Sequence, residues 1–467
     1  MDDILEQLRG IVGADRVLTG SDAAPWASDW TGKYLSNPIC VVRPGSTAEV
    51  SAVMAVANTA RIPVVPLAGN SGLTGAGRAD GAIVVSVDRL NQIREVRADA
   101  RLMVVEGGVI LDHILEAAAE HDLIFPLTFG ARGTARVGGF LGTNAGGSNV
   151  LRYGNTRDLV LGIEAVLADG RVMNLMTELH KDNSGYDLRD LIIGSEGTLA
   201  IITAAVLKLF PRPQSYASGY AAVPDLPAAL SLLNRLQRAT GSAVEAFEYM
   251  PRDYMELVRS HHPDRRQPFA EPYDINIFVE LGATGGEADG GPTISETLEQ
   301  LLSDAMEAGE VLDAVLAQNE AQRSDFWFLR EVAGEISFLR KPFLNLDLCL
   351  PLDRVAEYIE RMEKLVAKVD PGAEPSCIAH LGDGNVHNII YTSRNDPDLM
   401  EDLTGQVEDL ALELGGSFSA EHGVGVSKLG SMARRKDPVA LDVMRSIKAA
   451  LDPNGILNPG KVLPPAT

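Results

Sequence analysis

Three glycine-rich segments constrain the fold of this 467-residue chain more than any other feature of its sequence. The first, AGNSGLTGAG (68–77), directly follows a strand-like run, and the others occupy 133–147 and 194–203. Bare backbone N–H groups in such loops form concave sites for phosphate, and glycine permits close approach of a ligand. A single loop of this kind is as often a surface turn as a binding site. The three together indicate one large, extended ligand.

The first segment matches neither of the two common phosphate-binding motifs. Its glycines, at 69, 72, 75 and 77, do not have the G-x-G-x-x-G spacing, and no helix is expected to begin after it. The Gly-Lys-Ser/Thr of a Walker loop is also missing from it. We therefore expect a strand that runs into a loop whose N–H groups surround a phosphate or pyrophosphate, with Asn70, Ser71 and Thr74 as additional donors.

The charge balance argues against nucleic acid and membrane partners. Lys and Arg number 41 and Asp and Glu number 64, which gives a net charge of −23, and such a surface repels phosphate backbones and anionic lipid. The three cysteines, Cys40, Cys349 and Cys377, fit neither a disulfide scaffold nor a thiolate metal site. An acidic N-terminus and the lack of a long apolar run predict a cytoplasmic location and no membrane span.

Hydrophobic periodicity predicts an α+β protein whose first and second parts differ in their pattern of helices and strands. In the first part we expect helices at 2–12, after Ser46 and at 110–121, strands at 40–44, 62–67, 82–87 and 102–108, and a hairpin around 169–170. Prolines at 211–213 indicate a domain boundary. Strands near 217–223, 242–249, 273–281, 345–350 and 375–392, separated by helices, predict an antiparallel sheet, with a surface loop at 282–292. A last helix ends at 453–455 and an ordered arm follows.

A histidine and carboxylate cluster is the second chemical signal. The string HLGDGNVH predicts a tight turn between two strands, which brings His380 and His387 together. Glu421 and His422 come from a separate segment. Two imidazoles and a carboxylate with an open position suit a catalytic Zn²⁺, with Mn²⁺ or Fe²⁺ as alternatives. On these residues alone, buried histidines that donate to carbonyl groups are an equally good interpretation.

The strings PLAGNSGLTGAG, VGGFLGTNAGGSNVLRYGN, DLIIGSEGTLAIIT, HLGDGNVH, AEHGVG and LNPGK resemble the flavoproteins of the vanillyl-alcohol oxidase and p-cresol methylhydroxylase superfamily. Within it the chain is most similar to the D-2-hydroxy acid dehydrogenases that act on D-lactate and D-2-hydroxyglutarate. The resemblance implies a two-subdomain FAD-binding domain at 1–213 and an α+β cap domain with an antiparallel sheet at 214–412. A C-terminal segment, 413–467, would return to the flavin and metal site.

The resemblance also implies which residues line the FAD. The first loop would hold the pyrophosphate, and the other glycine-rich segments and the C-terminal arm would surround the rest. These residues are Ala68, Gly69, Asn70, Ser71, Gly72, Leu73, Pro126, Thr134, Gly138, Gly139, Asn144, Gly147, Ile202 and Asn458. Some relatives attach the flavin to a loop histidine, but neither loop has one here, so we expect non-covalent FAD.

The catalytic expectations come from the same resemblance. His380, His387 and Glu421 would hold the divalent metal, and His422 would be the base that takes the hydroxyl proton. The alternative for His422 is a further metal ligand or a group that orients one. Arg330, in DFWFLRE, would bind the substrate carboxylate bidentately, the alternative being a solvent-facing side chain on a helix.

Three positions depart from the D-2-hydroxyglutarate pattern. Gly334 stands where a hydroxyl residue is usual, Asn345 where a lysine is usual, and Ile389 where an asparagine is usual. Asn388 is one residue earlier, which on a strand points to the opposite face. We therefore expect the preference for D-2-hydroxyglutarate over monocarboxylates to be reduced or reversed.

The sequence thus predicts FAD- and metal-dependent oxidation of a D-2-hydroxy acid to the 2-keto acid, with hydride transfer to flavin N5. The alternatives are an oxidase that uses O₂, a flavin-binding subunit of a complex similar to glycolate oxidase, and a metal-dependent hydrolase. The expected partners are the small substrate, an electron acceptor that the sequence does not identify, and a second copy of the chain in a homodimer.

Overall fold

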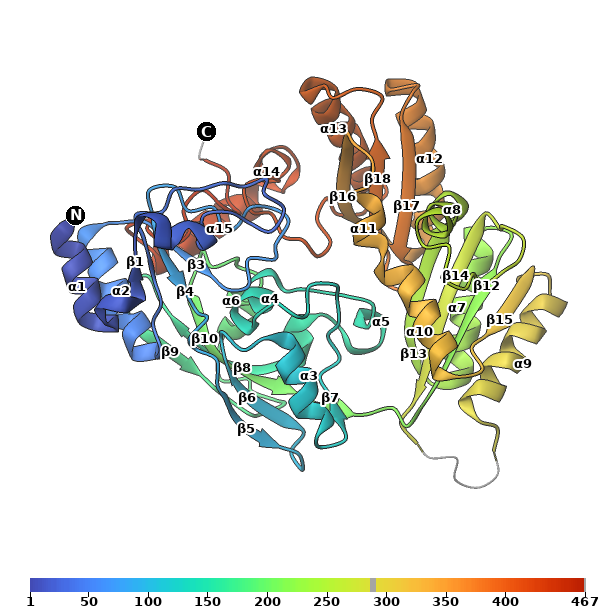
Figure 1. The fold of residues 1–467 in the computed structure, drawn as a ribbon, viewed down its shortest axis with the longest axis horizontal. Coiled ribbons are helices and arrows are strands. Elements are labelled where there is room, and N and C mark those ends of the chain that lie inside the picture. Colours follow the sequence, from blue (N-terminus) through green and yellow to red (C-terminus); the bar gives the residue numbers. More distant parts are fainter. Residues whose placement is uncertain (286–290, 466–467) are drawn as a thin grey trace.

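The N-terminal part contains a small sheet covered by helices. The structure, a computed structural model, describes residues 1–285 and 291–465. Strands β1 (Val17–Leu18), β2 (Cys40–Val42), β4 (Ile83–Ser86) and β3 (Val64–Leu67) form this sheet in that order. The last three are parallel. Helices α1 (Asp2–Val12) and α2 (Thr47–Ala60) cover one face, and the side chain of Ser46 caps α2 by accepting the Glu49 N–H (Figure 1).

A second, antiparallel sheet follows. Its order is β5 (Ile93–Arg97), β6 (Leu102–Glu106), β10 (Ile201–Lys208), β8 (Val160–Val166) and β9 (Val172–Leu175). Helices α3 (Leu111–Ala119), α4 (Val137–Thr143), α5 (Val150–Tyr153) and α6 (Leu188–Ile192) accompany this sheet, and β7 (Leu123–Ile124) pairs with β11 (Phe210–Pro211). The hairpin between β8 and β9 turns at Gly170, whose φ is +89°.

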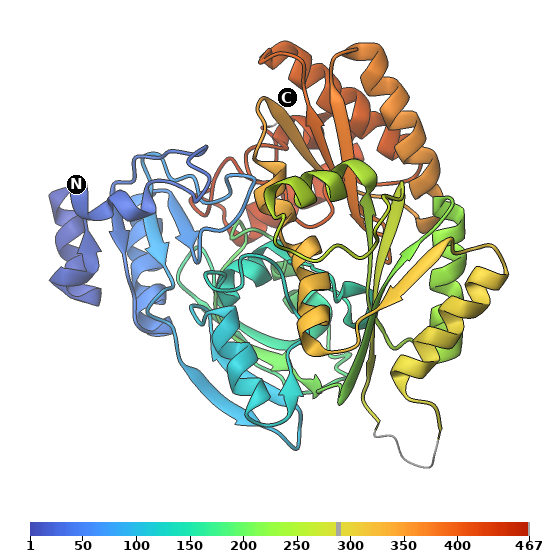
Figure 2. The ribbon, with the colours of Figure 1, turned by 45° about the vertical axis from the view of Figure 1, so that its right-hand side comes forward.

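The third sheet is antiparallel and lies between two layers of helices. Its order is β15 (Asp313–Leu316), β12 (Ser215–Ala222), β14 (Ile275–Ala283), β13 (Val244–Pro251), β17 (Glu374–His380), β18 (Asn385–Tyr391) and β16 (Phe343–Cys349). On one face pack α7 (Leu226–Thr240), α9 (Ile294–Glu307), α12 (Val355–Val369) and α13 (Pro397–Glu413). On the other pack α8 (Arg252–His261), α10 (Glu320–Glu331) and α11 (Ala333–Ser337), as Figure 2 shows. We call this unit the cap.

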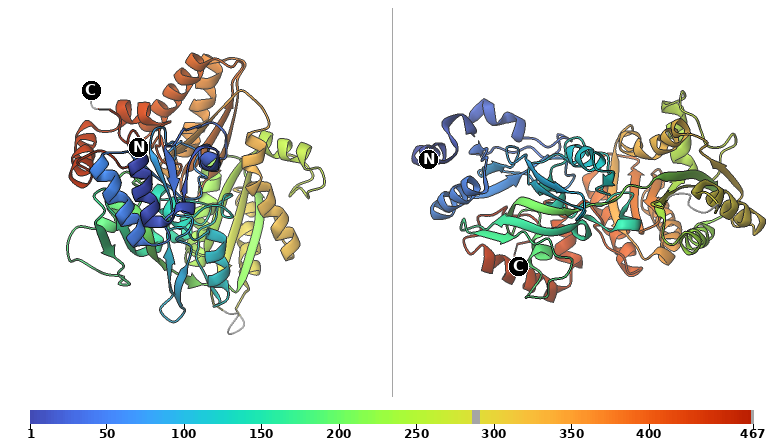
Figure 3. Two further views of the ribbon diagram at one scale, coloured as in Figure 1. Left: turned by 60° about the vertical axis from the view of Figure 1, so that its left-hand side comes forward. Right: turned by 90° about the horizontal axis from the view of Figure 1, so that it is seen from below.

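The end of the chain returns to the N-terminal part. After α14 (Leu429–Arg435) and α15 (Pro438–Leu451), the arm lies along β3. The N–H of Val64 donates to the carbonyl of Ile456 at 2.7 Å, and the N–H of Asn458 donates to the carbonyl of Val64 at 2.7 Å. Figure 3 shows these C-terminal elements beside the N-terminal sheets rather than in the outer part of the cap.

The expected α+β class is confirmed. The strand β5, the strand β15 and the helix α4 had not been expected from the sequence. Helix α4 lies inside the second glycine-rich segment, where packing of Phe140 and Leu141 outweighs the low helix propensity of glycine. The expected surface loop at 282–292 lies partly outside the described residues. Among the helices of the described ranges, none has the length and apolar character needed to cross a membrane. The cytoplasmic location stays a prediction.

Candidate functional site

The glycine-rich segments, the cap and the C-terminal arm meet around one cavity of about 1140 Å³. Its volume exceeds the usual range of small-molecule sites, so it has room for an extended dinucleotide. Most of the residues expected to bind FAD line it: Ala68, Gly69, Asn70, Ser71, Gly72, Leu73, Thr134, Gly138, Gly139, Ile202 and Asn458. Of the catalytic and metal residues expected from the sequence, Arg330, His387, Glu421 and His422 also line it. One cavity therefore holds both predicted sites.

Three of the expected FAD residues are not on the cavity wall. Pro126 is not among its lining residues. Asn144 ends α4 with a φ of +52°, and its side-chain oxygen accepts the N–H of Arg157 at 2.9 Å. A Cβ on Gly147 would lie 2.1 Å from the carbonyl oxygen of Thr128. In this structure Asn144 and Gly147 therefore shape the loop behind the wall.

The glycines of the first segment serve two different purposes. A Cβ on Gly69 would lie 2.1 Å from the carbonyl oxygen of Thr134, so this glycine lets the first and second segments touch. A Cβ on Gly72 would meet no atom within 4 Å, and Gly72 lines the cavity. Its backbone is therefore bare toward the cavity, as expected for N–H groups that bind a phosphate.

Asn458 provides a test of whether the cavity suits a flavin. Its side-chain amide donates to the carbonyl of Glu196 at 2.7 Å and to the carbonyl of Ala76 at 3.2 Å. Its Oδ1 is buried and finds no donor among the described residues. A buried oxygen without a partner is costly, and an N–H on a flat ligand in the cavity would satisfy it. The lining residues thus fit FAD.

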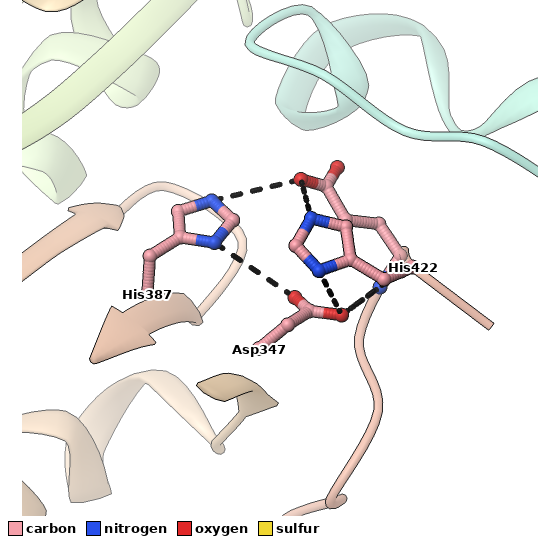
Figure 4. Close-up of side chains that lie close together, drawn as sticks. Asp347, His387 and His422 are labelled. Carbon is pink, nitrogen blue, oxygen red and sulfur yellow. Dashed lines mark hydrogen bonds and ion pairs between the residues drawn. The ribbon is translucent and has the colours of Figure 1, made fainter. Parts of the chain in front are cut away.

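Four side chains of types that can bind a metal ion converge at the cap end of the cavity. One ligand atom from each of Asp347, His387, Glu421 and His422 lies within 4.8 Å of the others. The Nε2 of His387 is 3.6 Å from Glu421 Oε1, and the Nε2 of His422 is 3.8 Å from the same oxygen. Figure 4 shows the imidazoles of His387 and His422 next to each other, with the carboxylate of Asp347 on one side of the pair and a second carboxylate on the other. The arrangement is suited to a divalent cation.

Asp347, on β16, anchors the segment that carries two of these groups. Its Oδ2 accepts the backbone N–H groups of Ala420, Glu421 and His422 at 3.2, 3.0 and 2.9 Å. Its Oδ1 accepts the side-chain amide of Asn385 at 2.9 Å. Burial by itself raises the pKa of a carboxyl group, but the adjacent His422 holds the pKa of Asp347 well below its usual range. Asp347 is therefore a buried anion whose oxygens are already occupied.

Glu196 holds the other end of the same segment. It lies in the third glycine-rich segment with a φ of +50°, and its carboxylate accepts the N–H groups of Val424 and Gly425 at 2.7 and 2.8 Å. The segment 420–425 is thus attached to the cap through Asp347 and to the N-terminal part through Glu196. Both attachments fix the position of Glu421 and His422 relative to the cavity.

His380 and Arg330 share a third buried carboxylate. The Nδ1 of His380 is 2.9 Å from Glu248 Oε1, and the Nε of Arg330 donates to Glu248 Oε2 at 2.7 Å. His380 is outside the group of four, although its ring centroid is 5.3 Å from that of His387. Burial by itself lowers the pKa of His380, but Glu248 more than offsets it, so this pKa is raised. Burial and His380 lower the pKa of His387 well below its usual value, so His387 is neutral.

Sequence reasoning missed the three carboxylates that organise the site: Glu196, Glu248 and Asp347. Each is less than a tenth exposed. A charged residue within an apolar strand is a signal, because buried charges are rarely left without a partner. Asp347 in LDLCL and Glu248 in VEAFEYM carry this signal, but it does not say which partner they have. The Nζ of Lys428 lies 3.6 Å from the Oδ2 of Asp347.

Comparison with known proteins places the chain among flavin-dependent enzymes. Residues 212–462 match the family model described as "FAD linked oxidases, C-terminal domain", and residues 38–176 match "FAD binding domain". The chain is 32% identical to a D-2-hydroxyglutarate dehydrogenase from Stutzerimonas stutzeri, over 98% of each chain. It is 34% identical to the mitochondrial D-2-hydroxyglutarate dehydrogenase of Bos taurus, over 99% of this chain and 84% of the relative.

Solved structures agree on the fold. p-Cresol methylhydroxylase with bound substrate superimposes with a TM-score of 0.75 at 17% identity, over 98% of this chain and 96% of the other. The 4-ethylphenol oxidase of Gulosibacter chungangensis gives a TM-score of 0.74 at 18% identity, over 99% of this chain and 97% of the other. At these identities the likeness concerns the fold alone.

Proposed function

This chain belongs to the FAD-linked oxidase family and is an FAD-dependent D-2-hydroxy acid dehydrogenase, and we propose that it also requires a divalent metal ion at the cap end of its cavity. The convergence of His387, Glu421 and His422 on the cavity lined by the glycine-rich segments carries the proposal. Such a site can hold an α-hydroxyl group beside both a cation and a base.

The ligands we propose are His380, His387 and Glu421. His387 is neutral, which is the form that binds a metal, and Glu421 faces it. The Nδ1 of His380 is engaged by Glu248, as is usual for a metal-binding imidazole whose other nitrogen is oriented by a carboxylate, and a bound cation would replace the proton that the raised pKa favours on this imidazole. Asp347 is the less suitable ligand, because its oxygens already accept four hydrogen bonds. Zn²⁺ fits this donor set, and Mn²⁺ or Fe²⁺ are the alternatives.

Arg330 and His422 complete the proposed machinery. Bound FAD would accept the hydride at N5, and a bound cation would favour ionisation of the substrate hydroxyl. Arg330 would hold the substrate carboxylate with the part of its guanidinium that Glu248 leaves free. His422 would take the hydroxyl proton at its Nε2, since its side chain lines the cavity and its backbone is fixed by Asp347. The product would be the 2-keto acid.

Reduction of the bound flavin by substrate tests this function. Under anaerobic conditions we expect D-2-hydroxy acids, and not their L-enantiomers, to bleach the flavin absorbance of the purified protein. Chelation should abolish the bleaching while FAD stays bound, and Zn²⁺ or Mn²⁺ should restore it. Full bleaching by a protein shown to be free of metal would contradict the metal requirement. A flavin that only an added protein partner renders reducible would indicate a subunit of a larger complex, and rapid reoxidation by O₂ would indicate an oxidase.

The FAD should be released by acid or heat. The loops that contain Gly69, Gly72, Gly138 and Gly139 have no histidine that could form a covalent link. After acid precipitation we expect flavin absorbance in the supernatant and none in the pellet. Flavin that remains with the denatured chain would show that another side chain is attached to it.

A further inference from the structure

On the face of the cap sheet that carries His387, strand β18 presents apolar and aromatic side chains farther from the proposed metal site. Alternate residues of β18 point to this face, so Ile389 and Tyr391 follow His387. In the pairing register, His387 lies between Asp347 and Ile378, and Ile389 lies between Asn345 and Ser376. Beyond His387, this face of the strand thus offers an aliphatic and an aromatic side chain instead of imidazole or carboxylate groups.

Asn388 does not contribute to this face. It is completely buried on the opposite side of the sheet, where its Oδ1 accepts a hydrogen bond from the Sγ of Cys377 at 2.7 Å. The side-chain amide of Asn388 therefore lies on the face opposite to the cavity, as expected from its position one residue earlier. On the cavity side, β18 has Ile389.

A second chamber adjoins the main cavity along the same face. It has a volume of about 320 Å³, and Ser337, Ile378 and Ile389 line both chambers. The two isoleucine side chains and the small serine are therefore the partition between the metal end of the main cavity and the second chamber. A substrate held at His387 and Arg330 would extend toward this partition.

Between the metal end of the main cavity and the second chamber, each cationic side chain of the described part of the chain already has an acidic partner. Arg330 is committed to Glu248 at 2.7 Å. Arg340, in the second chamber, pairs with Glu374 at 2.8 Å and lies over the ring of Tyr391. The second chamber also contains the carboxylates of Asp253 and Glu256, and Glu331 and Glu335 line the neighbouring part of the main cavity. Carboxylates therefore outnumber the arginines along these two chambers, which disfavours a second carboxylate on the substrate.

We propose that the substrate is a D-2-hydroxy monocarboxylic acid with an uncharged, apolar side chain of several carbons, which packs on Ile378 and Ile389 and extends toward the second chamber. This assignment rests on the proposed function of the same site. Ile378 and Ile389 are each only 5% exposed, and a methyl side chain makes little contact with their exposed atoms. A distal carboxylate is desolvated there without a partner. A longer aliphatic side chain contacts both isoleucines and loses no polar interaction.

A substrate series tests the assignment on the unmodified, FAD- and metal-loaded protein. The kcat/KM for flavin reduction should rise about fourfold for each methylene from D-lactate to D-2-hydroxyhexanoate, the value of one buried CH₂. D-2-hydroxypentanoate and D-2-hydroxyglutarate have the same chain length and differ in the methyl or carboxylate at C5. The pentanoate should be preferred by about tenfold or more. A preference for the glutarate, or no dependence on chain length, would overturn the assignment.

Matched variants locate the subsite. Asn345→Lys adds a cation beside Ile389, whereas Asn345→Met has a similar length and no charge. The lysine variant should raise the glutarate-to-pentanoate ratio of kcat/KM about tenfold or more relative to the methionine variant. Equal ratios would place the distal end of the substrate elsewhere and contradict the proposal.

Ile389→Ser should flatten the dependence on chain length, whereas Ile390→Val, on the opposite face in the core, should leave it unchanged. An unchanged slope in a folded Ile389→Ser protein would contradict the proposed packing. If no D-2-hydroxy acid reduces the flavin, the proposed function fails and the assignment falls with it. If D-2-hydroxyglutarate is the best substrate, the assignment alone fails.

Discussion

At the scale of single residues, the site depends on buried carboxylates whose oxygens bind other groups of the protein. Asp347 and Glu196 accept backbone N–H groups at the two ends of segment 420–425. Glu248 binds both Arg330 and His380. Because a buried carboxylate with several donors is rigid and charged, it fixes both the geometry and the protonation of its neighbours.

Replacement of His422 by asparagine should separate proton transfer from binding. The backbone N–H that Asp347 accepts is retained, so the segment should keep its position. We expect metal and FAD content to be unchanged and kcat to fall by about 10²- to 10⁴-fold, the usual contribution of a general base. Metal content measured by mass spectrometry is the check. If the variant loses its metal, His422 is a ligand and the base is another group.

Replacement of Asp347 should disturb the metal site through the backbone. In Asp347→Ala three N–H groups lose their acceptor, which costs roughly 3–5 kcal/mol of unfolding free energy, since each buried donor costs about 1–3 kcal/mol and the segment relaxes in part. Asp347→Asn retains one acceptor oxygen and should be intermediate in stability and metal content. Asn345→Ala, on the same strand and face, is the control. Wild-type metal affinity in Asp347→Ala would refute the anchoring role.

At the scale of elements, the hairpin of β17 and β18 and the helix α5 place the two halves of the site. The hairpin turns at Gly384, with a φ of +83°, and sets His380 and His387 on one face. Helix α5 joins the N-terminal part to β13 of the cap. There Glu245 accepts hydrogen bonds from Arg152, Asn149 and Tyr153 at 2.7, 3.0 and 3.0 Å. The cap is thus attached by a buried ionic contact.

Loss of Arg152 should therefore destabilise the whole protein. The Glu245 side chain is 3% exposed, and removal of the partner of a buried charge costs about 3–5 kcal/mol. We expect a clear fall in the unfolding temperature of Arg152→Ala. The double variant Arg152→Met with Glu245→Leu should recover much of the loss, because no unpaired charge remains. Lys364→Ala removes an exposed pair with Glu360 and should change the unfolding free energy by less than about 1 kcal/mol. If Arg152→Ala changed the unfolding free energy by as little as Lys364→Ala does, the contact between α5 and β13 would not contribute to stability.

At the scale of the whole molecule, the chain closes on itself through the C-terminal arm. Asn458 and Lys461 connect the arm to the first glycine-rich region and to the backbone next to it. The Nζ of Lys461 donates to the carbonyls of Arg78 and Pro459 at 2.6 and 3.1 Å. The division of the chain at about 213 and 412 and the homodimer stay predictions.

Lys461 should make stability depend on pH. Burial, with a smaller contribution from Arg78, lowers its pKa to about 8, whereas the unfolded value is about 10.4. Between these values the unfolded chain binds more protons, so stability rises with pH. Relative to Lys461→Met, the wild-type unfolding free energy should increase by about 2 kcal/mol from pH 7.5 to pH 9.5. Urea denaturation at both pH values measures this. The exposed Lys364→Met variant should show no such difference, and a wild-type gain equal to that of Lys461→Met would contradict the lowered pKa.

The sequence by itself determined the features that depend on local order. Strand and helix periodicity predicted the strands and the helix around β3, the β17–β18 hairpin and the arm after α15, because these features depend on residues close together in the sequence and on turn residues. It also predicted that His387, Glu421 and His422 share a site, through a resemblance of motifs. Only the tertiary structure decided the partners of Asp347, Glu248 and Arg330. These contacts join residues 38 to 132 positions apart, and their formation depends on which strands become neighbours and which face each strand turns to the cavity.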